Sequence, residues 1–206
     1  MRQGFMGKLL FVDLSKGTIK QEGITEKMRR EFMGGYGLGA RIIYERMPGK
    51  VDALGPNSMI GFLTGPLTGT PTPTSGRFVV VGKSPLTGTW GDANCGGDFG
   101  PYMKFAGVDG IFFSGKSTKP VYLYVENGKA ELRDASKLWG KDCLDTEDML
   151  KASHGAKTSV ACIGPSGENL SLLACVINEK GRAAGRSTAT TRRTRPCGTT
   201  RPPPSP

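Results

Sequence analysis

The chain has 206 residues, of which 37% are hydrophobic and 22% charged, so it is long enough for one domain with a core and too short for two large ones. The 31 glycines and 14 prolines predict many turns, while recurring apolar runs argue against disorder. No run approaches the roughly 20 apolar residues that span a bilayer, and Asp13 interrupts the first apolar run too early for a signal peptide. We therefore expect a cytoplasmic protein with no membrane partner.

Charge and cysteine content exclude further classes. The net charge is +10, but the last twenty residues hold four arginines and no acid, so residues 1–186 carry 24 − 18 = +6 with both signs interleaved. The sequence thus predicts no specific nucleic-acid partner, although the basic tail could bind nucleic acid in a non-specific, salt-dependent way. The five cysteines are widely spaced and form no C-x-x-C pair, so the sequence indicates neither a disulfide framework nor a zinc site.

In chain order, the first predicted elements are a hairpin and two helices. A strand over residues 8–14 leads through the turn Ser15-Lys16-Gly17 to a second strand that begins at Thr18. Thr25 is expected to cap a short helix that ends at about Met33, before Gly34 and Gly35. A second helix is expected over about residues 38–47, because Pro48 ends it.

The later elements are mostly strands, predicted at residues 59–63, 78–81, 110–114, 158–163 and 170–177. Alternating apolar residues on both sides of Asn127-Gly128 predict a hairpin with a two-residue turn. Asp145 or Thr146 is expected to cap a helix that runs to about Ser153. Because a regular β-α alternation is missing, the predicted fold class is mixed α+β with antiparallel or mixed sheets.

The hexapeptide "GPLTGT" at residues 65–70 returns as "SPLTGT" at residues 84–89. This repeat predicts two similar structural units that face one another, and the alternative is a common Pro and Gly turn that arises twice. After Arg186 the chain has no aliphatic residue larger than alanine. We therefore expect residues 187–206 to form a disordered tail outside the domain of residues 1–186.

Glycines cluster around Asn94, at positions 88, 91, 96, 97 and 100. Such a cluster indicates either a series of loops or main chain that a ligand approaches closely. Cys95 lies inside the cluster, where it is either reactive or a small apolar filler.

Arginines flanked by small residues stand in two other segments, at Arg77 and in "GRAAGR", which holds Arg182 and Arg186. They suit a phosphate group, while the alternative is pairing with surface carboxylates. The glycines of "GGYGLGA" at residues 34–40 do not have the spacing of a dinucleotide fingerprint. His154, the only histidine, is expected to be a surface residue.

Four segments carry a resemblance to a known family: "GKLLFVDLSKGTI", "GPLTGTPTPTSGRFVVVGKSPLTG", "DANCGGDFGPYMKFAGVDGIFFSGKSTKPVYLYV" and "IGPSGENLSLLACVINEKGRAAGR". In this order they resemble the N-terminal domain of the tungsten-containing aldehyde ferredoxin oxidoreductases, over about residues 4–186. The resemblance implies two facing β-sheets that form a base for a tungsten (or molybdenum) ion held by two pterin dithiolenes, with a magnesium ion between the pterin phosphates.

The resemblance also implies site residues. Arg77 would contact one pterin, and Gly96 and Gly97 would let it lie on the main chain. On the other pterin's side lie Arg182, Gly185 and Arg186. The main-chain carbonyls of Asn94 and Ala183 would bind the magnesium ion. No catalytic residue is expected within this chain.

For function, the resemblance implies the cofactor-binding domain of an enzyme that oxidises an aldehyde to a carboxylate and passes electrons to ferredoxin, with a homodimer as its full-length form. The [4Fe–4S] cluster of the family has no ligands among the five cysteines, so the chain alone is expected to be inactive. The abrupt change after Arg186 is interpreted as a frameshift or truncation. The alternative function is a non-enzymatic module that binds or carries a pterin cofactor.

Overall fold

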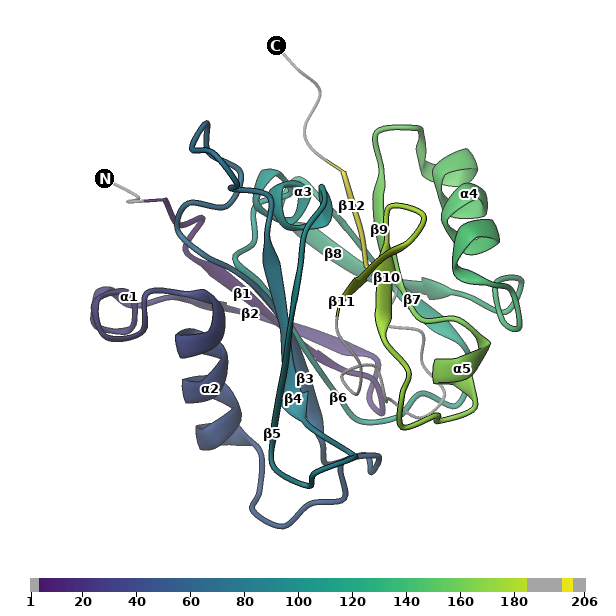
Figure 1. Ribbon diagram of the computed structural model, residues 1–206, viewed down its shortest axis with the longest axis horizontal. Coiled ribbons are helices and arrows are strands. Elements are labelled where there is room, and N and C mark those ends of the chain that lie inside the picture. Colours follow the sequence, from purple (N-terminus) through teal and green to yellow (C-terminus); the bar gives the residue numbers. More distant parts are fainter. Residues whose placement is uncertain (1–3, 185–197, 202–206) are drawn as a thin grey trace.

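Two six-stranded mixed sheets form the molecule, and the computed structural model describes residues 4–184 and 198–201 of it (Figure 1). Sheet A has the order β2-β1-β6-β3-β4-β5, and its strands are β1 (Lys8–Asp13), β2 (Thr18–Gly23), β3 (Met59–Thr64), β4 (Phe78–Lys83), β5 (Trp90–Cys95) and β6 (Gly110–Ser114). Sheet B has the order β11-β10-β9-β12-β7-β8, and its strands are β7 (Val121–Glu126), β8 (Lys129–Asp134), β9 (Ser159–Cys162), β10 (Val176–Asn178), β11 (Arg182–Ala184) and β12 (Gly198–Arg201). The pairs β1–β6 and β7–β12 are parallel and the other pairs antiparallel, so the predicted mixed α+β class with two facing sheets is confirmed.

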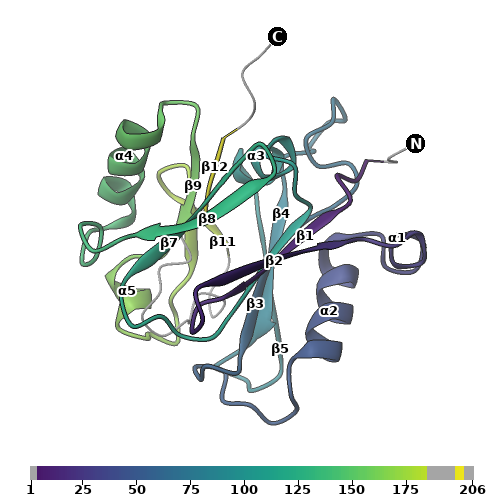
Figure 2. The same ribbon diagram turned by 180° about the vertical axis from the view of Figure 1, so that it is seen from behind.

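Helices cover the outer faces of the two sheets, as the front and back views show (Figures 1 and 2). Helices α1 (Glu26–Phe32) and α2 (Gly35–Arg46) lie on sheet A, and α4 (Cys143–His154) lies on sheet B. Helix α3 (Phe99–Phe105) contacts strands of both sheets, and the short α5 (Pro165–Glu168) lies between β9 and β10. No helix among the described residues combines the length and the apolarity needed to cross a membrane.

The main core fills the space between the sheets. Strand β4 contributes Phe78 and Val80, α3 contributes Phe99 and Met103, and sheet B contributes Val176 among others, all fully buried. Burial of one such side chain stabilises the fold by roughly 1.5–3 kcal/mol. The two sheets are therefore held together by one continuous apolar layer, and this layer fixes how their edges meet.

Local signals in the sequence act as predicted at the two hairpins and the first helix. Asn127 and Gly128 have φ values of 51° and 73°, as a two-residue turn of this kind requires. The Thr25 side chain accepts a hydrogen bond from the Met28 amide at 3.2 Å and so caps α1. Met33 ends that helix in the left-handed conformation, and α2 begins at Gly35, earlier than residue 38.

Three other predictions of local structure are wrong. The repeated hexapeptides form the connections after β3 and β4, at opposite ends of sheet A, so they are two similar turns rather than two facing units. Asp142 caps α4, because its side chain accepts from the Asp145 amide at 2.8 Å. The predicted strand over residues 170–177 is confined to β10, because α5 and its following turn occupy the preceding chain.

The tail also departs from the prediction of complete disorder. Residues 198–201 form β12, which lies between β9 and β7 in the middle of sheet B. Strand pairing uses main-chain groups, so a segment without large apolar side chains can still fill a gap between two strands. The rest of the segment predicted as disordered, residues 187–197 and 202–206, lies outside the described residues.

Candidate functional site

The two sheets meet along a pair of edge strands. Strand β5 lies at one edge of sheet A, β11 lies at one edge of sheet B, and the two strands contact each other (Figure 1). An edge strand leaves alternate N–H and C=O groups without a partner in its own sheet. The junction of β5 and β11 therefore brings main-chain groups from two distant parts of the sequence to one place.

Two guanidinium groups converge at this junction. Arg77 precedes β4 and its Nε donates a hydrogen bond to Oδ1 of Asn94 on β5, while Arg182 begins β11. A Cβ atom added at Gly96 would lie 3.8 Å from Nη1 of Arg77 and 3.8 Å from Nη1 of Arg182. The arginines and the glycine that the sequence singled out in separate segments are thus gathered around Gly96, with both arginine side chains exposed.

Two other predicted site residues, Ala183 and Asn94, lie on the two strands of this junction. Ala183 lies on β11, exposed and paired with Ile177, while Asn94 is exposed on β5 and paired with Val79. The hydrogen bond from Arg77 engages the side-chain amide of Asn94 and not its main-chain carbonyl. Gly185 and Arg186 lie outside the described residues.

Gly97 has a structural requirement of its own. Its φ is +102°, and an added Cβ would lie 2.5 Å from Asn178 Oδ1 and 2.8 Å from Glu179 Oε2. Side chains of the β10–β11 turn therefore occupy the space that any other residue would need. A substitution at Gly97 would be strained at this φ and would have to displace the side chains of Asn178 and Glu179, whereas a Cβ at Gly96 would make only ordinary contacts with the ends of two flexible arginines.

Cys95 is a buried residue of the core and not an exposed thiol, since only 1% of it is accessible. Its Sγ accepts a hydrogen bond from Asn178 Nδ2 at 3.0 Å. Burial raises the pKa of the Cys95 thiol, while the Asn178 hydrogen bond and the charges of Arg77 and Arg182 act in the opposite direction. The raised pKa keeps the thiol protonated at neutral pH, which favours the apolar-filler interpretation over the reactive one.

Asn178 and Glu179 are residues of the junction that the sequence analysis did not identify. Glu179 pairs with Arg182, with 2.8 Å between Oε2 and Nε, and it also accepts a hydrogen bond from the Asp98 amide. Asn178 is 1% exposed and donates to the Arg182 carbonyl at 3.2 Å as well as to Cys95. The segment "NEKGR" could have indicated this turn from the sequence, because Asn and Gly are typical turn residues. In the structure, Gly181 has the positive φ of a tight turn.

His154 lies away from this junction and is not the surface residue that was expected. It is half-buried at the end of α4, stacked on Tyr124 with 4.5 Å between ring centroids. Its Nε2 is 2.9 Å from the Tyr122 hydroxyl, and its Nδ1 is 3.2 Å from Nη1 of Arg133. Because a guanidinium only donates, Nδ1 accepts and Nε2 carries the proton. His154 thus joins α4 to sheet B.

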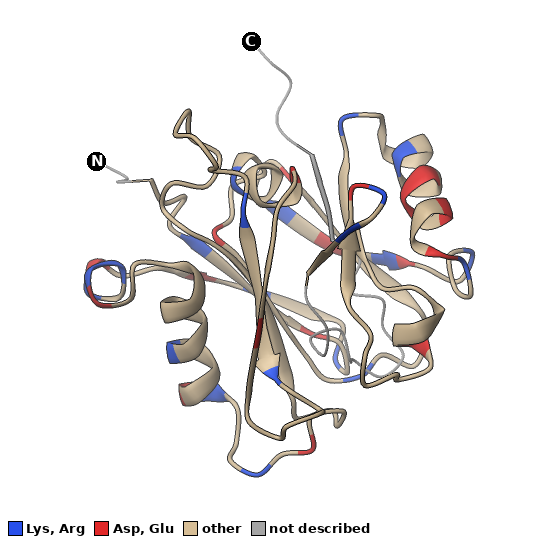
Figure 3. Ribbon diagram, in the orientation of Figure 1, with Lys and Arg blue, Asp and Glu red and all other residues tan. Residues whose placement is uncertain are grey.

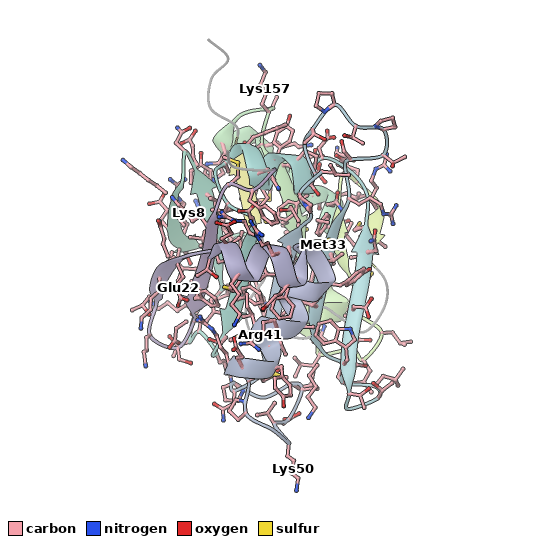
Figure 4. The ribbon with its side chains drawn as sticks, turned by 90° about the vertical axis from the view of Figure 1, so that its left-hand side faces the viewer. Lys8, Glu22, Met33, Arg41, Lys50 and Lys157 are labelled. Atoms are coloured by element: carbon pink, nitrogen blue, oxygen red, sulfur yellow. The ribbon has the colours of Figure 1, made fainter. Side chains whose placement is uncertain are left out.

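A separate hollow of about 710 Å³ lies on the other side of β5, between α2 and the β4–β5 hairpin. Figure 4 views this side of the molecule, with Arg41 on α2 and Lys50 at the far end of the following loop. The walls of this hollow are mainly apolar and include Phe32, Tyr44 and Trp90. None of the predicted site residues lines it, so it is distinct from the junction of the arginines.

The chemistry of the junction fits a large anionic group. Two guanidinium groups suit phosphate oxygens, and the adjacent edge strands add main-chain groups. In the described part of the chain, no three His, Cys, Asp or Glu side chains gather as a metal site. Elsewhere the charges of both signs are interleaved, as Figure 3 shows for the described residues.

Fold and site together define a two-sheet domain with two exposed arginines where the edge strands of its sheets contact each other. The chain belongs to the family described as aldehyde ferredoxin oxidoreductase, N-terminal domain, whose model matches residues 9–191. It is 48% identical over 184 residues to a tungsten-containing aldehyde ferredoxin oxidoreductase of Pyrococcus horikoshii and, equally, to one of Pyrococcus abyssi. Each match covers 89% of this chain and 30% of the relative, so the chain spans less than a third of their length.

A solved structure has the same fold. The active-site complex BamBC of benzoyl coenzyme A reductase, determined with 1,5-dienoyl-CoA, superposes with a TM-score of 0.91 at 33% identity. The match covers 98% of this chain and 31% of that one. The family predicted from four sequence segments is thus confirmed.

Proposed function

We propose that this chain is the cofactor-binding domain of an aldehyde:ferredoxin oxidoreductase and holds a tungsten bis-pterin cofactor with a magnesium ion. The observation that carries the proposal is the convergence of Arg77 and Arg182 on Gly96, where the edges of the two sheets meet. The names of the tungsten-containing relatives support tungsten as the metal, while the two pterins and the magnesium ion are part of the proposal.

In this proposal, each sheet edge binds one side of the cofactor. Arg77, Gly96 and Gly97 serve one pterin, and Arg182 serves the other, together with Gly185 and Arg186. Both arginines are exposed, so their Nη groups can donate to phosphate oxygens. Arg77 is oriented by Asn94, and Arg182 by Glu179.

Magnesium would take the main-chain carbonyls of Asn94 and Ala183, one from each edge strand. Hard cations such as magnesium prefer oxygen ligands and are commonly shared with phosphate groups. Because the two carbonyls belong to different sheets, bound magnesium would strengthen the contact between β5 and β11.

When bound, the tungsten–pterin group would supply the two-electron oxidation of an aldehyde to a carboxylate. The residues of this chain bind and orient that group and contribute no catalytic side chain. Electron transfer to ferredoxin, the [4Fe–4S] cluster and the homodimer belong, in this proposal, to the longer protein. The chain alone is expected to be inactive.

The test is expression of the full chain in a host that makes the tungsten–pterin cofactor, followed by anaerobic purification. Tungsten and molybdenum per chain are measured by mass spectrometry, and pterin by fluorescence after oxidation. We expect near-stoichiometric metal in the wild type and an about tenfold loss or more when both Arg77→Ala and Arg182→Ala are present, since each removes a charge-assisted contact.

A matched control is Arg30→Ala, which removes an exposed arginine of α1. It should leave the metal content unchanged. A folded wild-type chain that carries no metal or pterin above background would contradict the proposal. Release of the bound cofactor from the wild type to a cofactor-free oxidoreductase would instead favour a carrier module.

A further inference from the structure

The turn between β10 and β11 is anchored on two sides. On one side it is bound to α4, because the Lys180 amide donates to Glu147 Oε2 at 2.9 Å and Lys180 Nζ lies 2.6 Å from Asp148 Oδ1. In Figure 3, the acidic residues of α4 appear in red along the helix. On the other side, Asn178 and Glu179 face sheet A. The turn is therefore a fixed bridge between α4 and the edge of sheet A.

Glu179 uses its two carboxylate oxygens in different directions. Oε1 accepts from the amide of Asp98, in the loop that follows β5, while Oε2 holds Nε of Arg182 at 2.8 Å. The first contact ties the turn to sheet A, and the second orients a guanidinium whose Nη1 lies near Gly96. One side chain thereby sets the position of Arg182 relative to the loop that carries Gly96 and Gly97.

Asn178 makes a second link of the same kind in the buried layer beneath. Its Nδ2 donates to Cys95 Sγ on β5 at 3.0 Å and to the Arg182 carbonyl on β11 at 3.2 Å. Among the described residues its Oδ1 accepts no hydrogen bond, and this atom lies against Gly97. The close contact is possible only because Gly97 has no side chain.

We propose that Asn178 and Glu179 are positioning residues that hold the two halves of the cofactor site, the loop after β5 and the start of β11, at a fixed separation. The inference rests on the proposed function for the identity of the ligand. The contacts of Asn178 and Glu179 are made within the chain itself, so they can be tested on the protein without bound cofactor.

The variant that tests the link is Glu179→Ala, and its matched control is Asp148→Asn. Both changes remove one partly exposed ion pair of the same turn, but only Glu179 faces the site. Asn178→Ala is the second variant and removes both links from the buried side chain. Glutamine at position 179 is less informative, because its single amide oxygen could keep one of the two contacts.

The first readout is amide hydrogen exchange of the empty chain. We expect exchange at Asp98 to become about tenfold faster in Glu179→Ala, because its amide loses a carboxylate acceptor, and to stay as in the wild type in Asp148→Asn. In Asn178→Ala the buried link between Cys95 on β5 and β11 is lost, so opening of the junction should expose Cys95 and make its alkylation faster, although loss of the hydrogen bond raises the pKa of the thiol further. Unchanged exchange at Asp98 in Glu179→Ala would overturn the inference without touching the proposed function.

The second readout is metal and pterin per chain after expression in the cofactor-producing host, alongside the melting temperature. We expect Glu179→Ala to lose most of its cofactor at a melting temperature close to that of Asp148→Asn, which should keep its cofactor. Equal cofactor content in these two variants would reduce Glu179 to a structural residue and overturn the inference. A wild type that binds no cofactor would overturn the proposed function, and with it the ligand named here.

Discussion

At the level of single residues, a buried ion pair lies beneath residues 4–8. Lys104 of α3 and Asp109 form an ion pair of 3.2 Å with side chains only 5% and 1% exposed. Asp109 also accepts from the amides of Met6 at 3.0 Å and Gly7 at 2.6 Å, while Lys104 donates to the Gly4 carbonyl. The pair therefore fixes residues 4–8 against the start of β6.

Asp109→Asn should destabilise the protein by about 3–5 kcal/mol, because it leaves the Lys104 ammonium buried without a counter-charge. The side-chain N–H group of the new asparagine would also face a main-chain N–H group, where the Asp109 carboxylate accepts a hydrogen bond. Urea unfolding measures the change. Glu26→Gln, in an exposed pair of α1, is the control and should cost less than about 1 kcal/mol. Similar losses in both variants would contradict the role assigned to the buried pair.

The pH dependence of stability should carry the signature of Lys104. Burial lowers the pKa of Lys104, and Asp109 opposes this shift only in part. Between the lowered pKa and the ordinary value of about 10.4, the unfolded chain binds more protons than the folded one, so this contribution to stability increases with pH. The unfolding free energy of the wild type should therefore increase relative to Lys104→Met as the pH is raised from neutrality toward 10. An unchanged or opposite difference would show that the pKa is not lowered.

At the level of elements, strong local signals were sufficient for the hairpins and for α1. They failed where tertiary contacts decide the structure. Strand β5 has alternating exposed and buried residues but includes Gly91, Asp92 and Asn94, which are poor strand formers, and it exists because β4 pairs with it along its whole length. Strand β11 is similarly defined by β10 and by the contact with β5.

The same distinction applies to the candidate site. Arg77, Asn94, Gly96 and Arg182 were selected from the sequence because their motifs resemble a family, and the structure brings them together. Glu179 and Asn178 could not be selected in that way. Their role follows from the meeting of two sheet edges whose residues are more than 80 positions apart in sequence.

Arg46 adds a polar contact between helix α2 and the β1–β2 edge of sheet A, beside the apolar contacts that hold the helix on the sheet. Arg46 donates from Nη1 and Nη2 to the two carboxylate oxygens of Glu22 on β2, at 2.9 and 2.5 Å, and lies 3.9 Å from the centre of the Phe11 ring. Figure 4 shows Glu22 on the same side of the molecule as α2. Arg46→Ala should cost about 1–2 kcal/mol, since the pair is partly exposed and the ring contact adds to it.

Arg46→Lys is the matched variant and should recover only part of this loss, because an ammonium cannot bind a carboxylate with two parallel hydrogen bonds. The hydrogen bond from Arg46 is the main cause that lowers the pKa of Glu22. The stability from this pair is therefore present above the ordinary glutamate pKa and is lost as the pH falls through the lowered value. Chemical unfolding at pH 7 and pH 3 should show a smaller difference between wild type and Arg46→Ala at pH 3.

At the level of the whole molecule, sheet B depends on β12, the last strand of the described residues. Strand β12 pairs with β7 over Gly198–Arg201 and with β9 over Gly198–Thr200. Within the described residues, the order β11-β10-β9-β12-β7-β8 makes β12 the only connection, by strand pairing, between the hairpin β7–β8 and the strands β9 to β11, the last of which carries Arg182. The arginine site therefore depends on a segment that lies far from it along the sheet.

This dependence predicts different behaviour for two shortened chains. A chain that ends at Arg201 keeps β12 and should unfold like the full-length protein. A chain that ends at Cys197 loses β12, and its unfolding free energy should decrease by about 2 kcal/mol or more, because several main-chain hydrogen bonds are lost and two strand edges are left unpaired. In the shorter chain, hydrogen exchange should become faster in β9 and β10 as well as in β7, and with it at Asp98, whose amide is held by the turn after β10. Faster exchange confined to β7 would show that the layer between the sheets alone keeps β10 and β11 in place. In that case the two halves of the arginine site would be aligned by the core and by Glu179, independently of β12.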